Sequence, residues 1–276
     1  MGRALAILIW LLTTASVLLF FGGWWFPKNI STHGGEIDQQ FILTLIVVAI
    51  AFVAAEVGLG YALWRYGAAG EDRPAVYSHG NNRLEVTWTL VTAVVFITLA
   101  ILGQRVWAKR YFQPAPANSF QIHVVPQQFQ WNFHYPGPDG VFGRTNPRFM
   151  SDAGGNFVGL DDADPRAKDD VQVTTLAVPV NRPVELIMHG KDVTHAIWIP
   201  QLRLKQDVVP GMNLRVYFTA TETGKYEIAC AELCGQFHYR MKAYLLVLPD
   251  DEFNSLTSLK EDDFKTRITE LLARYK

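Results

Sequence analysis

The sequence predicts N-terminal membrane-spanning helices, followed by an all-β domain and a C-terminal helix. Long apolar runs are confined to the first part of the 276-residue chain. From about Gln113 the pattern changes to short alternating segments separated by Pro and Gly, which is typical of a β-sandwich or small barrel. Amphipathic helical spacing returns only after Pro249. We therefore expect a membrane anchor over residues 1–112, a β domain over 113–249 and an amphipathic helix over 250–276.

The apolar runs are long enough to cross a hydrocarbon core at about 1.5 Å per residue. They cover about residues 4–25, 41–64 and 86–106, and Glu56 interrupts the second. The first run has a rival interpretation as a secretory signal, because Arg3 precedes it. It exceeds the usual apolar length of such a signal and no typical cleavage site follows, so we expect three spanning helices.

Basic residues near the ends of these runs indicate the orientation. Those that would lie inside are Arg3, Arg65, Arg73 and Arg83. The first outer loop carries Lys28, and further basic residues just after the third run argue the other way. The balance favours a multi-pass membrane protein whose C-terminal half is exported. We expect the membrane to be a bacterial inner membrane, with this half on the periplasmic side.

Seven segments of the second half have the alternation and the β-branched or aromatic residues of strands. They are Gln121–Val125, Gln128–Tyr135, Val171–Val178, Pro183–Met188, Leu214–Thr219, Lys225–Ala229 and Lys242–Leu248. Between the second and third lies Pro136–Asp170, which is rich in Gly, Asp and Pro and poor in apolar periodicity. We expect this stretch to be a long surface insertion.

The overall charge argues against nucleic acid as a partner. Lys+Arg 25 and Asp+Glu 26 nearly cancel, whereas a polyanion requires a basic surface. The sequence also contains no C-x-x-C-H motif, so we expect no covalently attached haem.

A cluster of soft metal donors follows one of the predicted strands. Cys230, Cys234, His238 and Met241 lie close together, and His195 lies in a separate upstream loop. Thiolate, thioether and imidazole ligands suit copper. One Cys, two His and a Met would complete a mononuclear site but leave the second Cys unused.

Two thiolates four residues apart can instead bridge two copper ions, each also bound by one His. Met241 would then be a weak axial ligand to one ion, and the backbone carbonyl of Glu232 could serve the other. A structural disulfide is a competing interpretation, because an exported domain with two cysteines usually oxidises them. A zinc site is another, but zinc motifs rarely include Met. The order His, Cys, Cys, His, Met favours copper.

These residues make the chain resemble subunit II of the haem-copper cytochrome c oxidases, from the second apolar run to Leu248. Residues 192–195 resemble the family's D-V-x-H motif, 205–211 its K-x-D-x-x-P-G motif and 230–241 its C-x-E-x-C-x-x-x-H-x-x-M motif. The resemblance implies a cupredoxin-like Greek-key barrel with a dinuclear copper A centre. It implies as copper ligands the side chains of His195, Cys230, Cys234, His238 and Met241 and the carbonyl of Glu232.

The resemblance also implies a function and partners. Such a subunit accepts electrons from a cytochrome c-type donor and relays them to the haems of subunit I, where oxygen reduction is coupled to proton translocation. The carboxylate of Glu232 would help to bind a magnesium ion shared with subunit I. Two alternatives stay open: a quinol oxidase subunit II, against which the intact ligand set argues, and a membrane-anchored copper carrier, against which a ligand set on a β scaffold argues.

The chain departs from the family in the strand that usually carries Q-W-x-W. Phe129 stands where the family has its electron-accepting tryptophan, so Phe129 and Trp131 are the candidates for receiving electrons. Phe133 and Tyr135 lie on the same strand face and are expected in the core, with Gln130, Asn132 and His134 on the opposite face. The third apolar run adds one crossing to the family's usual two.

Carboxylates in or beside the apolar runs are functional candidates, because a charge in a bilayer is costly. Glu85 opens the third run and matches the family's E-x-x-W-T motif, which implies proton uptake from the inside. A carboxylate is also favoured at any helix N-terminus. Glu56 matches no motif, and pairing with another subunit is as reasonable as a proton role.

The insertion concentrates acidic residues. They are Asp152, Asp161, Asp162, Asp164, Asp169 and Asp170. Two interpretations stay open: a solvated loop, or a surface whose field steers a basic electron donor.

Overall fold

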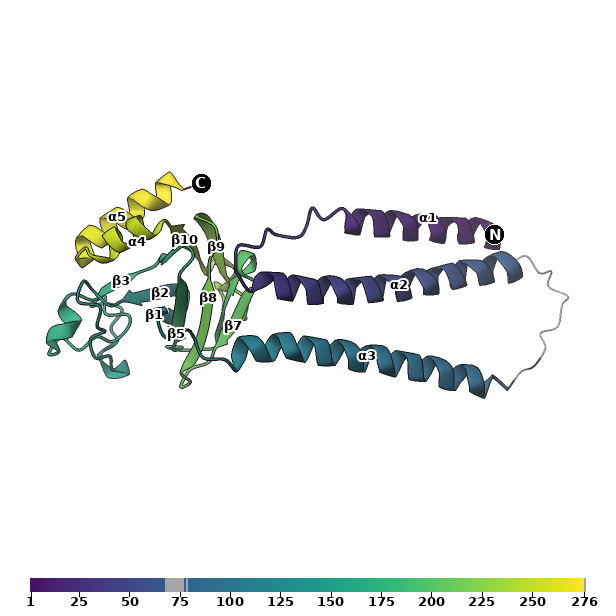
Figure 1. Cartoon of the computed structure of the whole chain (residues 1–276), viewed down its shortest axis with the longest axis horizontal. Coiled ribbons are helices and arrows are strands. Elements are labelled where there is room, and N and C mark those ends of the chain that lie inside the picture. The colour runs from purple at the N-terminus through teal and green to yellow at the C-terminus, as the bar shows by residue number, and fades with distance from the viewer. Residues whose placement is uncertain (68–76, 78, 276) are drawn as a thin grey trace. The chain divides into compact units, whose positions relative to one another are not determined.

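The computed structural model describes residues 1–67, 77 and 79–275, and Figure 1 shows the order of the helices and strands. The chain divides into two compact units. The helical unit comprises Met1–Pro27 and Glu36–Phe112, and the mainly β unit comprises Lys28–Gly35 and Gln113–Lys276. Arg73, which contributes to the predicted orientation, lies outside the described residues.

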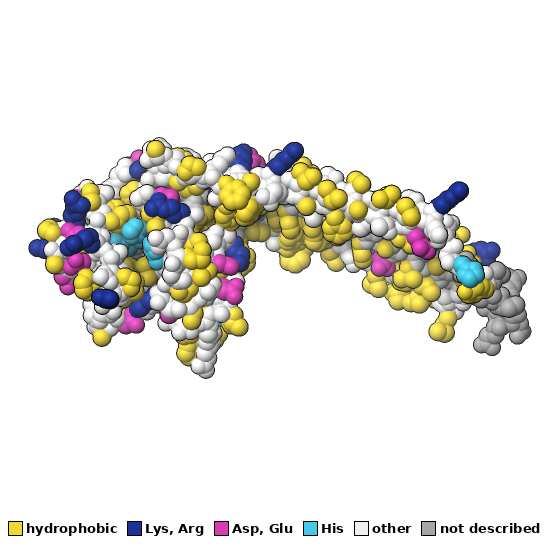
Figure 2. All heavy atoms as spheres, turned by 90° about the horizontal axis from the view of Figure 1, so that it is seen from below, with side chains coloured by type: hydrophobic (Ala, Val, Ile, Leu, Met, Phe, Trp, Pro, Cys, Tyr) yellow, Lys and Arg dark blue, Asp and Glu magenta, His cyan; other side chains and the backbone are white. Residues whose placement is uncertain are grey.

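Three long helices form the first unit: α1 (Gly2–Phe21), α2 (Gly34–Tyr66) and α3 (Asn82–Tyr111). Each is long and apolar enough to cross a membrane. Most of their large apolar side chains are exposed, and Figure 2 shows hydrophobic side chains over much of this part. Lipid tails are an apolar solvent, so such side chains need no protein partner. The described residues of this unit therefore provide three candidate spans.

Helices α1 and α2 meet where aromatic rings pack on a glycine. The Trp10 indole covers Gly60 so closely that an added Cβ would lie 2.2 Å from the indole nitrogen. The Trp10 ring stacks on Trp64 with centroids 6.0 Å apart, and the Arg3 guanidinium lies 5.4 Å from the Trp64 centroid. A small residue lets two membrane helices approach in this way. Gly60 therefore supports the packing of the extra helix α1.

Two five-stranded sheets form the β unit. Their strand orders are β3-β2-β1-β5-β8 and β4-β10-β9-β6-β7. The strands are β1 (Phe120–Gln127), β2 (Gln130–Tyr135), β3 (Val171–Val173), β4 (Leu176–Pro179), β5 (Pro183–Met188), β6 (His195–Ile199), β7 (Leu204–Val208), β8 (Leu214–Thr219), β9 (Gly224–Cys230) and β10 (Lys242–Leu248). Ile122 and Leu186 of the first sheet and Leu245 of the second are fully buried in one shared core. The architecture is a β-sandwich.

The strands differ from the sequence prediction in three places. The expectation of one strand over 171–178 is wrong, because β3 and β4 lie in different sheets. β6 and β7 are absent from the prediction. Four of the five side chains of β6 are buried, which removes the alternation of a half-exposed strand. β7 mixes Lys, Gln and Asp at the edge of its sheet.

The C-terminal segment forms two helices instead of the single helix expected: α4 (Asp250–Thr257) and α5 (Glu261–Arg274). Phe253 of α4 lies edge-on to Phe120 at 5.0 Å between centroids. Phe264 of α5 lies 5.2 Å from the ring of Tyr135. Both phenylalanines are fully buried. The segment therefore extends the core of the β unit.

The insertion between β2 and β3 covers the outer face of the first sheet. Asn132 and His134 lie on that face, as predicted, and both are buried. The imidazole of His134 bonds the carboxylate of Asp170 at 2.6 Å (Nε2 to Oδ2), and the backbone N–H of Gly143 donates to the same carboxylate at 2.9 Å. Since both side chains of this pair are fully buried, the contact holds the insertion against the sheet.

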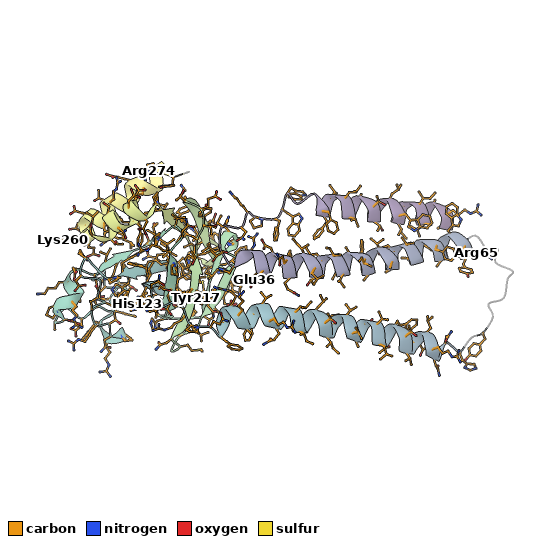
Figure 3. The ribbon with its side chains drawn as sticks, viewed as in Figure 1. Glu36, Arg65, His123, Tyr217, Lys260 and Arg274 are labelled. Carbon is orange, nitrogen blue, oxygen red and sulfur yellow. The ribbon has the colours of Figure 1, made fainter. Side chains whose placement is uncertain are left out.

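Beside this pair lies His123, labelled in Figure 3, whose ring stacks on Phe142 with centroids 4.0 Å apart. Burial, followed by the nearby His134 and His189, lowers the pKa of His123 to about 3. The folded chain therefore keeps this imidazole neutral, while the unfolded chain protonates it below about pH 6.5. Between these two values the unfolded state binds more protons, so the folded state loses stability as the pH falls.

We predict that His123→Phe flattens this pH dependence. The substitution keeps an aromatic ring against Phe142 and removes a group that contributes a slope of up to about 1.4 kcal/mol per pH unit. The measurement is urea unfolding of the detergent-solubilised chain at several pH values between about 6.5 and 4. A slope equal to that of the wild-type chain would show that His123 is not the group responsible.

Candidate metal centre

Backbone pairing brings the two donor-bearing loops together. β6 and β9 are antiparallel neighbours in which Ile197 lies opposite Cys230. His195 is the first residue of β6, and the N–H of Ala231 donates to the Ala196 carbonyl at 2.9 Å. The side chain of His195 therefore lies beside the thiol of Cys230, with 4.0 Å between Nδ1 and Sγ.

The loop from β9 to β10 supplies the other donors. The Sγ atoms of Cys230 and Cys234 are 3.9 Å apart. Cys234 Sγ lies 3.6 Å from His238 Nδ1 and 3.7 Å from Met241 Sδ, and Cys230 Sγ lies 3.2 Å from the Glu232 carbonyl. The structure thus brings all six predicted donor groups into one cluster, with a different imidazole facing each thiol.

The two cysteines are free thiols in the structure. A disulfide would require sulfur atoms about 2.0 Å apart, far less than the observed distance. That distance is shorter than twice a metal–thiolate bond of about 2.3 Å, so one ion can contact both sulfurs. The chemistry and spacing of the donors therefore fit a metal centre in which both thiolates are ligands.

Most of this cluster is shielded from water. His195, Cys230, Cys234 and Met241 are buried, and His238 is partly exposed. The centre therefore has a low-dielectric interior and one edge toward solvent, at His238.

The two thiols differ in acidity. Burial opposes ionisation of Cys230, but hydrogen bonds from His195 and from the backbone of Ala196 outweigh it and lower the pKa of this thiol to about 6. Burial raises the pKa of Cys234 to about 11, and the neighbouring Cys230 adds to the effect. A cation that binds both cysteines as thiolates therefore has to offset the raised pKa of Cys234.

Asp192 orients the upstream imidazole. Its Oδ1 lies 2.8 Å from Nε2 of His195, and a carboxylate can only accept, so Nε2–H donates and the ring is held with Nδ1 toward Cys230. Burial opposes ionisation of Asp192, but hydrogen bonds from the backbone N–H of Gln128 and from His195 lower its pKa. For His195, burial is likewise outweighed by hydrogen bonds to Cys230 and Asp192, which raise its pKa.

The two-residue turn between β1 and β2 touches the donor loop. Nε2 of Gln128 donates to the Cys234 carbonyl at 2.5 Å, and its backbone N–H donates to Asp192 at 2.7 Å. The Phe129 ring lies edge-on to Phe237 at 5.4 Å. Sequence reasoning missed Gln128, which it placed at the start of a strand, because the identity of one residue does not show which loop will pack against it.

The candidates for receiving electrons occupy different environments. Phe129 is partly buried at the edge of the core beside the donor loop, whereas Trp131 is 1% exposed and its ring lies 6.3 Å from that of His195. Leu233 and Tyr239 of the donor loop are strongly exposed. The rim of the cluster therefore exposes the large apolar and aromatic side chains of Leu233, Phe237 and Tyr239, beside the polar Gln236 and Arg240.

Two predicted carboxylates belong to different units of the chain. Glu232 belongs to the donor loop, where its side chain is partly exposed. Glu85 lies in the first turn of α3, in the helical unit, and is exposed. The helix is capped by Asn81, whose side chain accepts from the N–H groups of Arg83 and Leu84. The structure thus places Glu85 at a helix N-terminus, which suits a carboxylate.

Fold and site together define a membrane-anchored β protein with a cupredoxin-like centre of thiols and imidazoles. The family described as cytochrome c oxidase subunit II, periplasmic domain, matches residues 120–247, and the one described as its transmembrane domain matches 21–106. The chain belongs to the cytochrome c oxidase subunit II family. The predicted fold class is thereby confirmed, and helix α1 precedes almost all of the matched transmembrane region.

Two sequence relatives of known name support this membership. The alternative cytochrome c oxidase subunit 2 of Bradyrhizobium diazoefficiens is 33% identical, over 91% of this chain and 90% of that protein. Cytochrome c oxidase subunit 2 of Alkalihalophilus pseudofirmus is 29% identical, over 79% of this chain and 57% of that protein. The crystal structure of the periplasmic domain of subunit II from Bradyrhizobium japonicum is 25% identical, over 55% of this chain and 99% of that one, with a TM-score of 0.40.

We predict that Gly235→Ala loosens the donor loop. A Cβ at Gly235 would lie 2.6 Å from Nε2 of Gln128, which displaces that amide from the Cys234 carbonyl, and its φ of +140° disfavours any side chain. We expect a loss of about 1–3 kcal/mol in stability together with weaker copper binding. Urea unfolding and copper titration of the full chain measure both.

Gly155→Ala is the matched control. Gly155 also has a positive φ, of +71°, but no atom lies within 4 Å of its added Cβ. It should lower stability through backbone strain alone and leave copper binding unchanged. Equal copper binding by both variants would contradict the role assigned to the contact at Gly235.

Proposed function

We propose that this chain is the electron-accepting subunit of a cytochrome c oxidase. It receives electrons from a cytochrome c-type donor at a dinuclear copper centre and passes them to the haems of subunit I for oxygen reduction coupled to proton translocation. The observation that carries the proposal is a pair of free, buried thiols 3.9 Å apart, each facing a different imidazole. A mononuclear site has no use for the second thiol.

The proposed ligands follow from this arrangement. They are the side chains of His195, Cys230, Cys234, His238 and Met241 and the carbonyl of Glu232. When bound, the two copper ions would accept and release one electron shared between them. The soft donors suit copper, and their placement at the ends of paired strands holds them in one geometry, which limits rearrangement when the charge of the centre changes.

The surrounding residues keep this centre dry and accessible at one edge. The core of the sandwich excludes water from the thiols, which strengthens their electrostatic interaction with a cation. The partly exposed His238 and the apolar rim of Leu233, Phe237 and Tyr239 form the side on which we propose that the donor docks. A transferred electron then needs to cross few protein atoms.

The acids of the insertion contribute less free charge than their number indicates. Asp152 forms an ion pair with Lys191, and a hydrogen bond from Lys191 lowers its pKa. Asp161 and Asp164 lie 3.0 and 3.5 Å from nitrogens of Arg144. Asp170 is buried against His134. We therefore propose that the donor is held mainly by the apolar rim.

The remaining partners also belong to the proposal. The three helices would anchor the chain in a bacterial inner membrane with the β unit on the periplasmic side, beside subunit I. The carboxylate of Glu232, partly exposed beside the thiols, is available for a magnesium ion shared with subunit I. Glu85, exposed in the first turn of α3, is available to take up protons from the inside.

Replacement of the bridging thiol tests the dinuclear assignment. We predict that Cys234→Ser retains at most one copper ion and loses the electron spin resonance signal of an unpaired electron shared by two coppers. The reason is that a serine hydroxyl is a hard, weakly acidic donor that bridges copper poorly. Metal analysis with spin resonance on the purified chain measures this. Two coppers with an unaltered spectrum would exclude Cys234 as the bridge.

Replacement of the membrane carboxylate tests proton uptake. We predict that Glu85→Gln slows steady-state oxygen consumption by the assembled oxidase and leaves the rate of copper reduction by the donor unchanged. The amide keeps the shape of the side chain but cannot carry a proton. Oxygen-electrode and stopped-flow measurements separate the two rates. Equal loss of both would indicate a defect of assembly.

A further inference from the structure

We infer that Gln128 is a positioning residue of the metal centre, which ties the loop that carries His195 to the loop that carries Cys234. The inference rests on the proposed function, because it concerns the same donors. It adds a third structural element, the β1–β2 turn, to a centre otherwise built from the ends of β6 and β9.

One arm of this link reaches the upstream loop. The backbone N–H of Gln128 donates to Oδ2 of Asp192 at 2.7 Å, and Oδ1 of the same carboxylate accepts from His195 Nε2 at 2.8 Å. Both oxygens of Asp192 are therefore engaged, one by the turn and one by the donor imidazole. The position of the turn thus limits how far the His195 ring can rotate.

The other arm reaches the downstream loop. The side-chain amide of Gln128 donates to the backbone carbonyl of Cys234 at 2.5 Å. This carbonyl belongs to the residue whose thiol lies 3.9 Å from that of Cys230. Holding the carbonyl fixes the peptide plane between Cys234 and Gly235, and therefore the direction in which the Cys234 side chain leaves the backbone.

The same turn also fits the loop by shape. Gly235 lies so close to the turn that an added Cβ would be 2.6 Å from the Gln128 amide and 3.1 Å from the Phe129 ring. Phe129 in turn packs edge-on against Phe237. From Ala231 to Phe237 the donor loop has no helix or strand, so contacts with the turn replace the backbone ladder that holds the rest of the sheet.

If Gln128 positions the metal ligands, its replacement should change copper affinity and the copper spectrum more than it changes the stability of the fold. Partners that orient metal ligands typically change metal affinity by about 10- to 100-fold when they are removed. Gln128 is itself an exposed turn residue, so its replacement removes no core packing. Loss of the amide donor should therefore weaken copper retention and change the copper spectrum, while the apo chain unfolds at the wild-type urea concentration.

The test compares one substitution at two positions of the same hairpin. Gln128→Glu keeps the size of the side chain but removes the donor to the Cys234 carbonyl. Gln130→Glu is the matched control, because the side-chain amide of Gln130 donates to Asn132, and this hydrogen bond involves neither donor loop. Full-length chains in detergent are loaded with copper, and chelator competition, electron spin resonance and the reduction potential are measured. Gln128→Met provides a second variant without a donor or a charge.

We expect both Gln128 variants to lose copper to the chelator about 10- to 100-fold more readily than wild type. We also expect a changed spin resonance spectrum and a shifted potential, with Gln130→Glu unchanged. Wild-type affinity, spectrum and potential in both Gln128 variants would overturn the positioning role, and so would an equal change in Gln130→Glu. The wild-type chain is measured separately, because it tests the proposed function. If the wild-type chain binds no pair of copper ions, the proposed function is wrong, whatever the Gln128 variants show.

Discussion

The pairing of β6 with β9 determines where the metal centre lies. It places His195 beside Cys230, although the two residues are 35 positions apart in the chain. The antiparallel return of β10, with Lys242 opposite Ala229, then brings Met241 back to the thiols. Burial of the donors and the edge that faces solvent both follow from this arrangement. The hydrogen bonds of this ladder are made by backbone groups and not by the donor side chains, as in the bond from Cys230 N–H to the Met241 carbonyl, so the ladder sets the geometry before any ion binds.

The donors themselves could be predicted from the sequence, because their chemistry is carried by residue type and spacing within one short loop. The strands that position them could not. β6 is short and almost wholly buried, so neither its length nor its periodicity separates it from a turn of buried helix. β7 carries polar residues whose extended state depends on pairing with β6. Both are defined by long-range partners, which local patterns do not contain.

The side-chain contacts of the acidic insertion and of Gln128 could not be predicted from the sequence either. A sequence gives the number of charges but not the distance from each charge to its counterion. Asp170 is a buried partner of His134, and Asp152 is paired with Lys191, so neither adds a free surface charge. Nothing in the local sequence distinguishes Gln128 from other polar residues near a turn. Its two hydrogen bonds to the donor loops form only when the β1–β2 hairpin packs against those loops.

The insertion between β2 and β3 also has its own apolar cluster, formed by Val158 and Leu160 with Val125 of β1. This segment has its own packing and its own hydrogen bonds. Its outer turns can therefore be lengthened or shortened while the side that packs on the first sheet stays in place. Selection can therefore remodel this surface among related chains while the sheet beneath it, and the donor cluster at the ends of β6 and β9 in the other sheet, stay the same. Variation in the length of the insertion need not disturb the metal chemistry.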